Sequence, residues 1–366
     1  MVDKSVSLIR LRLRKFRHLK RGYYSFLFLV GTYGLSFFLP FIMGFRPIVV
    51  RYQDQYYFPA FATYLSETFG WGNGKVYLGS EFDQLKVNGQ MIFGEADYRA
   101  LREQFRDQNN ENFVLLPPIT YGPYENFLQL KGNPPHTPSS VHWMGTDNAS
   151  RDILVRLSYG YRISISFALA VTAVAYLLGT TVGAVLGYFG RWVDILGQRF
   201  VEIWTAVPFL YTVIILGSIF PRNFKMLTAI LAAFGWMSIT YYIRGEFYRE
   251  KAKDYVAAAI ATGEGNLKIM VSHILPNALT PIIAFAPFAI VGSLVALVSL
   301  DFLGYGLPAP TPSWGELLRQ ARESGMSKWH LVVFPLGTMF ITLQLIVFIG
   351  EAVREAFDPK VFSRLR

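Results

Sequence analysis

Residues 163–190 read ISISFALAVTAVAYLLGTTVGAVLGYFG and contain no Asp, Glu, Lys or Arg. An α-helix rises 1.5 Å per residue, so about 20 apolar residues cross the roughly 30 Å hydrocarbon core of a membrane. Stretches of comparable length and character lie at 23–45, 201–221, 226–243, 279–303 and 330–350. The sequence therefore predicts an all-α integral membrane protein with six transmembrane helices.

The composition supports a membrane protein. Apolar residues make up 52% of the chain and charged residues only 16%, whereas soluble domains carry about 25% charged residues. The chain has no Cys, which excludes disulfides and thiol catalysis, and its five His residues show no metal-ligand spacing. We therefore expect neither a metal site nor nucleic-acid binding, although the net charge is +10.

The basic residues at the start of the chain indicate its orientation. Residues 1–22 hold eight Lys or Arg and one Asp, a bias that keeps a segment in the cytoplasm and attracts it to the lipid bilayer. The first helix, 23–45, then leaves residues 46–162 on the external side of the membrane as a mixed insert and lead-in to the second span. A five-helix core follows at 163–350, with a cytoplasmic loop at 244–278 and a cytoplasmic tail at 351–366.

Ionisable side chains are absent from the six stretches except near their ends. Ion-coupled carriers usually bury such a group to bind the driving ion, and a membrane enzyme needs a general base or metal ligands. The absence therefore argues against an ion-coupled secondary transporter or channel, which is the alternative reading, and against an enzyme.

Small residues recur in the second stretch at four-residue spacing, as Gly179, Gly183 and Gly187. Such a row lets another helix approach closely. The partner helix is either one of this chain or one of another subunit.

The loop 244–278 contains an Ala-rich segment that ends at a glycine. Ala257, Ala258 and Ala259 favour a helix, and Gly263 favours a sharp turn after it. Pro276 is placed to begin the next span.

These residues resemble a known family. The pattern Ala258-Ala259-x-x-x-Gly263, followed by Leu275-Pro276, resembles the "EAA" loop of ABC importer permeases. In that family the loop forms a coupling helix that docks on the ATP-hydrolysing subunit. Ala257 stands where the signature has Glu, and Asp254 stands where peptide permeases often have Glu, so a salt bridge from the signature Glu is not implied here.

Further segments resemble the dipeptide and oligopeptide (DppC/OppC) permeases of this family. Residues 145–152, GTDNASRD, are similar to GTDxxGRD with Ser150 in place of Gly, and residues 312–315, PSWG, are similar to PxWG. The long insert, with Phe58-Pro59, and residues 200–204, FVEIW, are similar to YejE-type oligopeptide and microcin C permeases.

The resemblance implies the type I ABC importer permease fold and a multi-pass subunit of the bacterial inner membrane, with oligopeptides or microcin C-like peptides as cargo. It implies three partners: a homologous second permease, ABC ATPase subunits with two nucleotide-binding domains, and a periplasmic peptide-binding protein. The chain lacks a GxxxxGK[ST] phosphate loop. We therefore expect it to be non-catalytic and to bind no cofactor, with ATP and Mg²⁺ used by the partner ATPase. Substrate-binding residues are not identified from the sequence.

Overall fold

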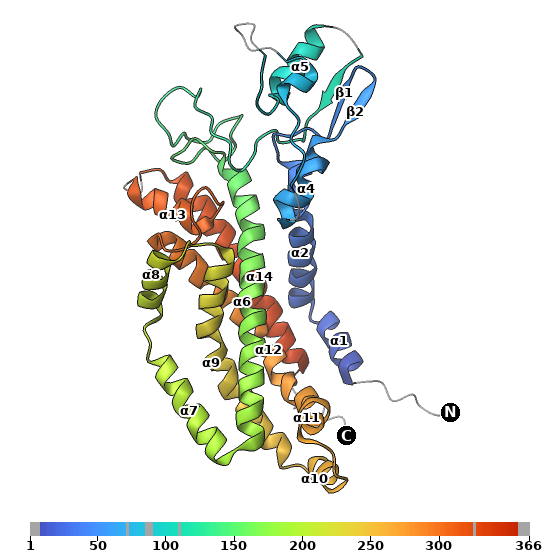
Figure 1. The fold of residues 1–366 in the computed structure, drawn as a ribbon, viewed down its shortest axis with the longest axis vertical. Coiled ribbons are helices and arrows are strands. Elements are labelled where there is room, and N and C mark those ends of the chain that lie inside the picture. Colours follow the sequence, from blue (N-terminus) through green and yellow to red (C-terminus); the bar gives the residue numbers. More distant parts are fainter. Residues whose placement is uncertain (1–7, 71–72, 85–90, 109–110, 325–326, 358–366) are drawn as a thin grey trace, which may run out of the picture. The chain divides into compact units, whose positions relative to one another are not determined.

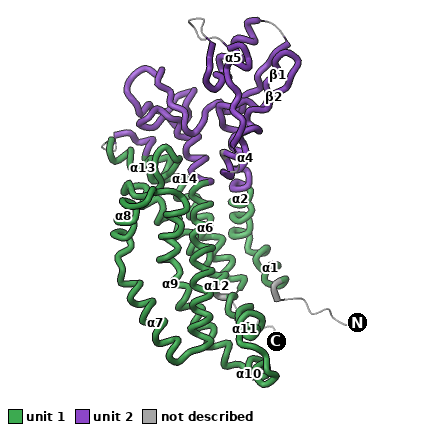
Figure 2. Tube along the Cα trace, in the orientation of Figure 1, with its two compact units in different colours: residues 1–31, 163–326, 332–366 green, residues 32–162, 327–331 purple. Residues whose placement is uncertain are grey.

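The computed structural model describes residues 8–70, 73–84, 91–108, 111–324 and 327–357 (Figure 1). The chain divides into two compact units (Figure 2). Residues 1–31, 163–326 and 332–366 form unit 1, and residues 32–162 and 327–331 form unit 2.

Helices make up nearly all of unit 1. In chain order, and including three that unit 2 shares, they are α1 (Leu8–His18), α2 (Lys20–Ser36), α6 (Ile153–Phe189), α7 (Arg191–Thr205), α8 (Phe209–Ile219), α9 (Phe224–Lys251), α10 (Asp254–Ala261), α11 (Asn266–Lys268), the π-helical turn η2 (Ile269–Ile274), α12 (Leu275–Leu303), α13 (Trp314–Glu323) and α14 (His330–Phe357).

Four helices among the described residues are long and apolar enough to cross a membrane: α6, α9, residues 282–303 of α12, and α14. The pair α7 and α8 adds a fifth span if the two bent helices count as one. The structure thus has four or five such spans by length and composition, where the sequence predicts six.

The third expected span, 201–221, is not one straight helix. The chain is helical from Arg191, breaks after Thr205, and continues as α8 with a bend of 73°. Pro208 explains the break because it has no N–H to donate and disfavours helical geometry at the residue before it.

The first expected span, 23–45, is also shorter as a helix. The helix α2 ends at Ser36 after 17 residues, and a separate short helix, α3 (Leu39–Ile42), follows a turn. Pro40 accounts for the end of α2, since a proline ring clashes with the carbonyl four residues earlier, here that of Ser36. At 1.5 Å per residue, α2 is about 25 Å long.

Other helices outrun the expected limits. The helix α6 begins ten residues before position 163, where the Asp152 carboxylate accepts a hydrogen bond from the Val155 N–H at 3.0 Å. The helix α9 continues to Lys251 and α14 to Phe357, so the loop 244–278 and the tail 351–366 are partly helical. Residues 1–7 and 358–366 of the expected terminal segments lie outside the described residues.

Unit 2 contains a small α/β fold. Its strands are β1 (Val49–Tyr52), β2 (Gln55–Tyr57) and β3 (Phe113–Leu115), and in the described residues they form an antiparallel sheet in the order β2-β1-β3. Its further helices are α4 (Pro59–Phe69), the 3₁₀ turn η1 (Gly79–Phe82) and α5 (Tyr98–Asp107). Phe82, Leu101 and Phe105 are buried against β1 and β3. The insert therefore has its own hydrophobic core.

The segment 145–152 forms a buried polar turn before α6. The Asp147 carboxylate accepts hydrogen bonds from the backbone N–H and the Nε of Arg151, at 2.9 and 2.8 Å. Ser150, at the Gly position of the GTDxxGRD pattern given above, has a φ of 57°. The turn therefore keeps the left-handed conformation that favours glycine, and Ser150 adopts it at a steric cost.

We expect the Ser150→Gly variant to be more stable than the native chain. The left-handed conformation costs a residue with a Cβ about 1–2 kcal/mol, which glycine avoids. Glycine's larger loss of backbone entropy on folding, about 0.5–1 kcal/mol, offsets only part of this gain. The melting temperature of the purified chain should rise by about 1 °C. The matched control, Ala149→Gly, replaces a residue without a positive φ and should lower it. A fall in both variants would contradict this account of the turn.

Candidate functional site

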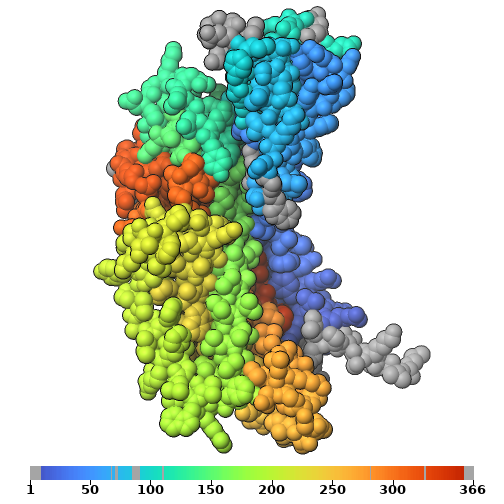
Figure 3. Space-filling model, in the orientation of Figure 1, coloured from blue at the N-terminus to red at the C-terminus, as the bar shows by residue number. Residues whose placement is uncertain are grey.

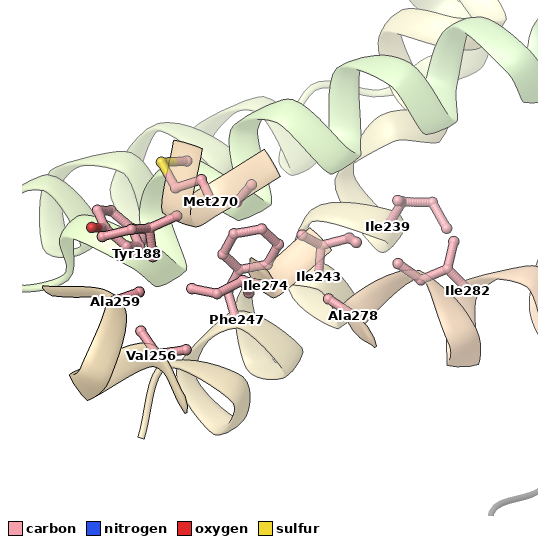
Figure 4. Close-up of a cluster of buried hydrophobic side chains, with 12 residues drawn as sticks. Tyr188, Ile239, Ile243, Phe247, Val256, Ala259, Met270, Ile274, Ala278 and Ile282 are labelled. Carbon is pink, nitrogen blue, oxygen red and sulfur yellow. The ribbon is translucent and has the colours of Figure 1, made fainter. Parts of the chain in front are cut away.

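The helix α10 lies between α9 and α12 in the chain and buries one of its faces. Val256 is fully buried and Ala259 is 8% exposed. Both belong to a cluster with Phe247 of α9 and with Met270 and Ile274 of η2 (Figure 4). The small side chain of Ala259 lets the helix lie close against these neighbours. This packing holds α10 against α9 and η2.

The other face of α10 is open. Ala257 and Ala258 are exposed, Ile260 is 51% exposed, and Asp254 in the first turn is also exposed. Leu267 and Val271, four residues apart on α11 and η2, add further exposed apolar surface. Figure 3 shows this segment, in orange, at the end of unit 1. The loop thus presents small and apolar side chains on a helix whose other face is held by the core.

Gly263 ends α10 in a left-handed conformation with a φ of 76°. The Gly263 N–H donates to the Ile260 carbonyl at 3.0 Å, and the Glu264 N–H donates to the Ala259 carbonyl at 3.2 Å. This pair of bonds is the Schellman motif, in which glycine is preferred at the left-handed position. No atom lies within 4 Å of the place a Cβ would take on Gly263, so the requirement for glycine comes from the backbone alone.

A carboxylate at the end of α9 holds the start of α10. Glu250 is 5% exposed, and its oxygens accept hydrogen bonds from Lys253 Nζ at 2.7 Å and from the Tyr255 hydroxyl at 2.8 Å. Burial, and then the bond to Glu250, raise the pKa of Tyr255, because both disfavour its phenolate. These contacts brace the turn between the two helices.

A second carboxylate orders the segment after Gly263. Glu264 accepts hydrogen bonds from Lys268 Nζ at 2.9 Å and from His273 Nε2 at 2.6 Å. The bond from Lys268, and then that from His273, lower the pKa of the Glu264 carboxyl, since both stabilise its charged form. These two hydrogen bonds therefore join Glu264 to Lys268 of α11 and to His273 of η2.

Leu275 and Pro276 begin α12 directly after the π-helical turn η2. Leu275 packs against the buried cluster of α10, while Pro276 is exposed. Pro276 is in the first turn of α12, where its missing N–H costs little. The structure thus joins Val256, Ala259 and Leu275 in one core and leaves Asp254, Ala257, Ala258 and Pro276 on the surface.

The glycine row on α6 packs against α9 of the same chain. A Cβ on Gly179 would lie 2.5 Å from the Trp236 carbonyl oxygen, and one on Gly183 would lie 2.7 Å from that of Thr240. A Cβ on Gly187 would lie 2.6 Å from the Cβ of Phe247. The partner of this row is therefore a helix of this chain, and the contact runs down to the loop that carries α10.

Sequence reasoning did not find the long-range contacts that hold this loop. The Tyr188 hydroxyl at the end of α6 donates to Asn266 Oδ1 at 2.8 Å across 78 residues of sequence, and Lys251 Nζ donates to the Tyr188 carbonyl. No local pattern indicates such pairs. The Glu264–Lys268 pair is local in sequence, since its opposite charges lie four residues apart, but Glu264 precedes α11 and the pair is not a contact within one helix.

Comparisons with known proteins agree on one family. The family described as "Binding-protein-dependent transport system inner membrane component" matches residues 179–363. The chain is 39% identical to the inner membrane ABC transporter permease protein YejE of Escherichia coli, covering 95% of this chain and 96% of that protein.

Two further relatives extend the comparison. The peptidoglycan transport system permease protein YejE of Agrobacterium fabrum is 37% identical over 95% of this chain and 92% of its own. The oligopeptide transport system permease protein OppC of Haemophilus influenzae is 36% identical over 61% of this chain and 72% of its own. The chain therefore belongs to the inner membrane components of binding-protein-dependent transport systems, the permeases of ABC transporters, and it is similar over nearly its whole length to YejE proteins.

Proposed function

We propose that this chain is the non-catalytic permease subunit of an ATP-driven peptide importer, and that α10 is the helix through which a separate ATPase moves it. The observation that supports this most strongly is the geometry of α10. One face is packed into the helix core, the other is exposed and lined by alanines, and a Schellman turn at Gly263 fixes its end.

The packing of α10 allows movement to pass from the loop to the spans. If α10 were held only by a flexible loop, a partner could displace it without moving the membrane-spanning helices. Here Glu250 ties α10 to α9, and the shared cluster ties it to η2 and α12. A displacement of α10 therefore shifts the ends of α9 and α12, which is a rigid-body route to alternating access.

The Ala258→Arg variant tests whether α10 is a docking surface. Ala258 is exposed and arginine is a good helix former, so the chain should fold. A charge buried without a partner in an interface costs several kcal/mol, and we expect at least tenfold less ATPase to co-purify. The control, Ala258→Ser, adds no charge and should retain the ATPase. Equal recovery with both variants would contradict docking at this face.

The names of the relatives support the proposed cargo. OppC is named for oligopeptides and one YejE for peptidoglycan, and both cargoes contain peptide. We assign peptides, free, microcin C-like or carried on a cell-wall fragment, to this importer. The chain would form half of the path with a homologous second permease, receive cargo from a periplasmic peptide-binding protein, and leave ATP and Mg²⁺ to ATPase subunits with two nucleotide-binding domains.

The proposed topology retains six crossings, by α2, the α7–α8 pair and the four long helices, with the N-terminus and α10 in the cytoplasm and residues 46–162 in the periplasm. Two features support it. The basic start of the chain favours the cytoplasm, and the insert has a folded core of its own. A folded, water-facing excursion on one side is consistent with this placement.

The topology can be tested by labelling single-cysteine variants. The chain contains no Cys of its own, so a maleimide labels only the introduced residue. Leu128 in the insert is 82% exposed and Leu267 in the loop is 75% exposed. In spheroplasts making this chain alone, an impermeant maleimide should label Leu128→Cys directly and Leu267→Cys only after permeabilisation. The reverse pattern would contradict the orientation.

A further inference from the structure

A basic cavity lies among the ends of four helices in unit 1. Its volume is about 700 Å³. The residues that line it come from α1, from the end of α9 and the turn after it, from the beginning of α12 and from the end of α14: Arg12, Arg249, Glu250, Lys253, Asn277, Thr280, Ala284, Phe285, Arg354 and Phe357. The function proposed above uses the contacts of Glu250 but assigns no ligand to this cavity.

Four cationic side chains line the cavity against one carboxylate. Two of the four are neutralised inside the chain, because Arg249 pairs with Glu246 and Lys253 pairs with Glu250. Neither Arg12 nor Arg354 forms an ion pair with any described residue. Within the described residues, which end at Phe357, the cavity therefore holds two positive charges without a counter-charge.

Arg12 is held in place by two contacts, and one of its N–H donors has no acceptor among the described residues. Its Nη1 donates to the Thr280 hydroxyl at 3.1 Å, and its guanidinium carbon lies 5.2 Å from the centre of the Phe357 ring. Its Nε is buried and has no hydrogen-bond partner among the described residues. A buried N–H without an acceptor is unfavourable. An oxygen-rich anion in the cavity would instead accept from the Nη hydrogens of Arg12 that Thr280 does not use.

The polar and apolar parts of the lining suit a particular class of ligand. Thr280 accepts the bond from Arg12, so its own hydroxyl hydrogen remains able to donate. Arginine forks match the oxygens of phosphate groups. Beside these donors, Ala284, Phe285 and Phe357 supply apolar surface, and the volume exceeds that of a bare inorganic anion.

We propose that this cavity binds a phosphate group through Arg12 and Arg354. The phosphate is carried by an anionic phospholipid headgroup or by a free phosphate anion. Basic pockets between transmembrane helices are suited to such groups. A bound phosphate would join α1 to α14, where Lys15 Nζ already donates to the Glu355 carbonyl at 2.6 Å, and would hold both against the end of α12.

The test uses the full chain purified in a nonionic detergent and titrates its melting temperature with three probes. These are short-chain phosphatidylglycerol, short-chain phosphatidylcholine and inorganic phosphate. We expect phosphatidylglycerol to raise the melting temperature and phosphatidylcholine to leave it unchanged. Stabilisation by inorganic phosphate as well would identify the free anion as sufficient, and stabilisation by phosphatidylglycerol alone would identify the lipid headgroup as the source.

Arginine variants separate a built site from general attraction of anions. Arg12→Ala and Arg354→Ala should each weaken the effective probe about fivefold, as expected for the loss of one basic contact near phosphate. The matched control, Arg14→Ala, removes the same charge from an exposed position on the same helix and should weaken it less than twofold. Arg354 is also exposed, so its variant should fold even if Arg12→Ala does not.

Two results would overturn the proposal. One is the absence of stabilisation by both phosphate-bearing anionic probes. The other is an equal loss of affinity in Arg14→Ala and Arg354→Ala, which would mean that the basic surface attracts anions without a defined site. Neither readout involves peptide transport, so failure here leaves the proposed function unaffected.

Discussion

The Gly263→Val variant is expected to insert into the membrane and fold, but to lose about 90% or more of ATP-driven peptide uptake. The cause is backbone strain at the end of α10. A β-branched residue at a φ of 76° is strongly disfavoured. The chain would leave the left-handed conformation and break the bonds from the Gly263 and Glu264 N–H groups. The end of α10 would then move relative to its anchored face. The measurement is uptake of a defined peptide together with ATP hydrolysis by the assembled transporter.

Gly265 provides the matched control. It lies two residues away, also has no atom within 4 Å of a Cβ position, and has a φ of −70° that any residue adopts. Gly265→Val should therefore retain most of the uptake. If Gly263→Val transports normally, or if both variants lose uptake equally, α10 does not depend on the turn at Gly263 as we propose.

The Gly183→Leu variant is expected to destabilise the chain itself. A Cβ at this position would lie 2.7 Å from the Thr240 carbonyl oxygen and 2.8 Å from the Cβ of Ile243, so α6 and α9 would have to separate. Overpacking of this kind costs roughly 1–3 kcal/mol or more. The melting temperature of the purified chain should fall by about 4 °C or more, with a lower yield from the membrane.

Gly337 on α14 is the control for that substitution. No atom lies within 4 Å of its Cβ position, so Gly337→Leu should leave the melting temperature of the isolated chain nearly unchanged. A native-like melting temperature for Gly183→Leu would show that the close contact of α6 with α9 is not needed for the fold.

The sequence predicted the apolar helices well because their signal is local. Long runs without charge, such as residues 163–190, form α6, α9, α12 and α14. The limits of these helices were less predictable, since polar residues at both ends continue the helix when neighbouring elements satisfy them. The breaks after Ser36 and Thr205 follow from Pro40 and Pro208. The helices α12 and α14 nevertheless continue through Pro287 and Pro335, so a proline alone does not predict where a helix ends.

The candidate site was predictable in part for the same reason. The run Ala257-Ala258-Ala259 and Gly263 indicated a helix and a turn, and the structure has both. The bond between Tyr188 and Asn266 joins residues 78 apart and has no signal in a single sequence. The basic cavity could not be predicted from the sequence, because Arg12 and Arg354 are far apart in the chain and line the same cavity only in the folded protein.

Peptide uptake into proteoliposomes is the most direct test of the central claim, that this chain is a permease moved by a separate ATPase. The vesicles contain this chain, its partner permease and the ATPase subunits, with the binding protein outside. We predict that a labelled peptide accumulates only when ATP is hydrolysed, and that vesicles without the ATPase accumulate none. Uptake by this chain without the ATPase, driven by an ion gradient, would contradict the account.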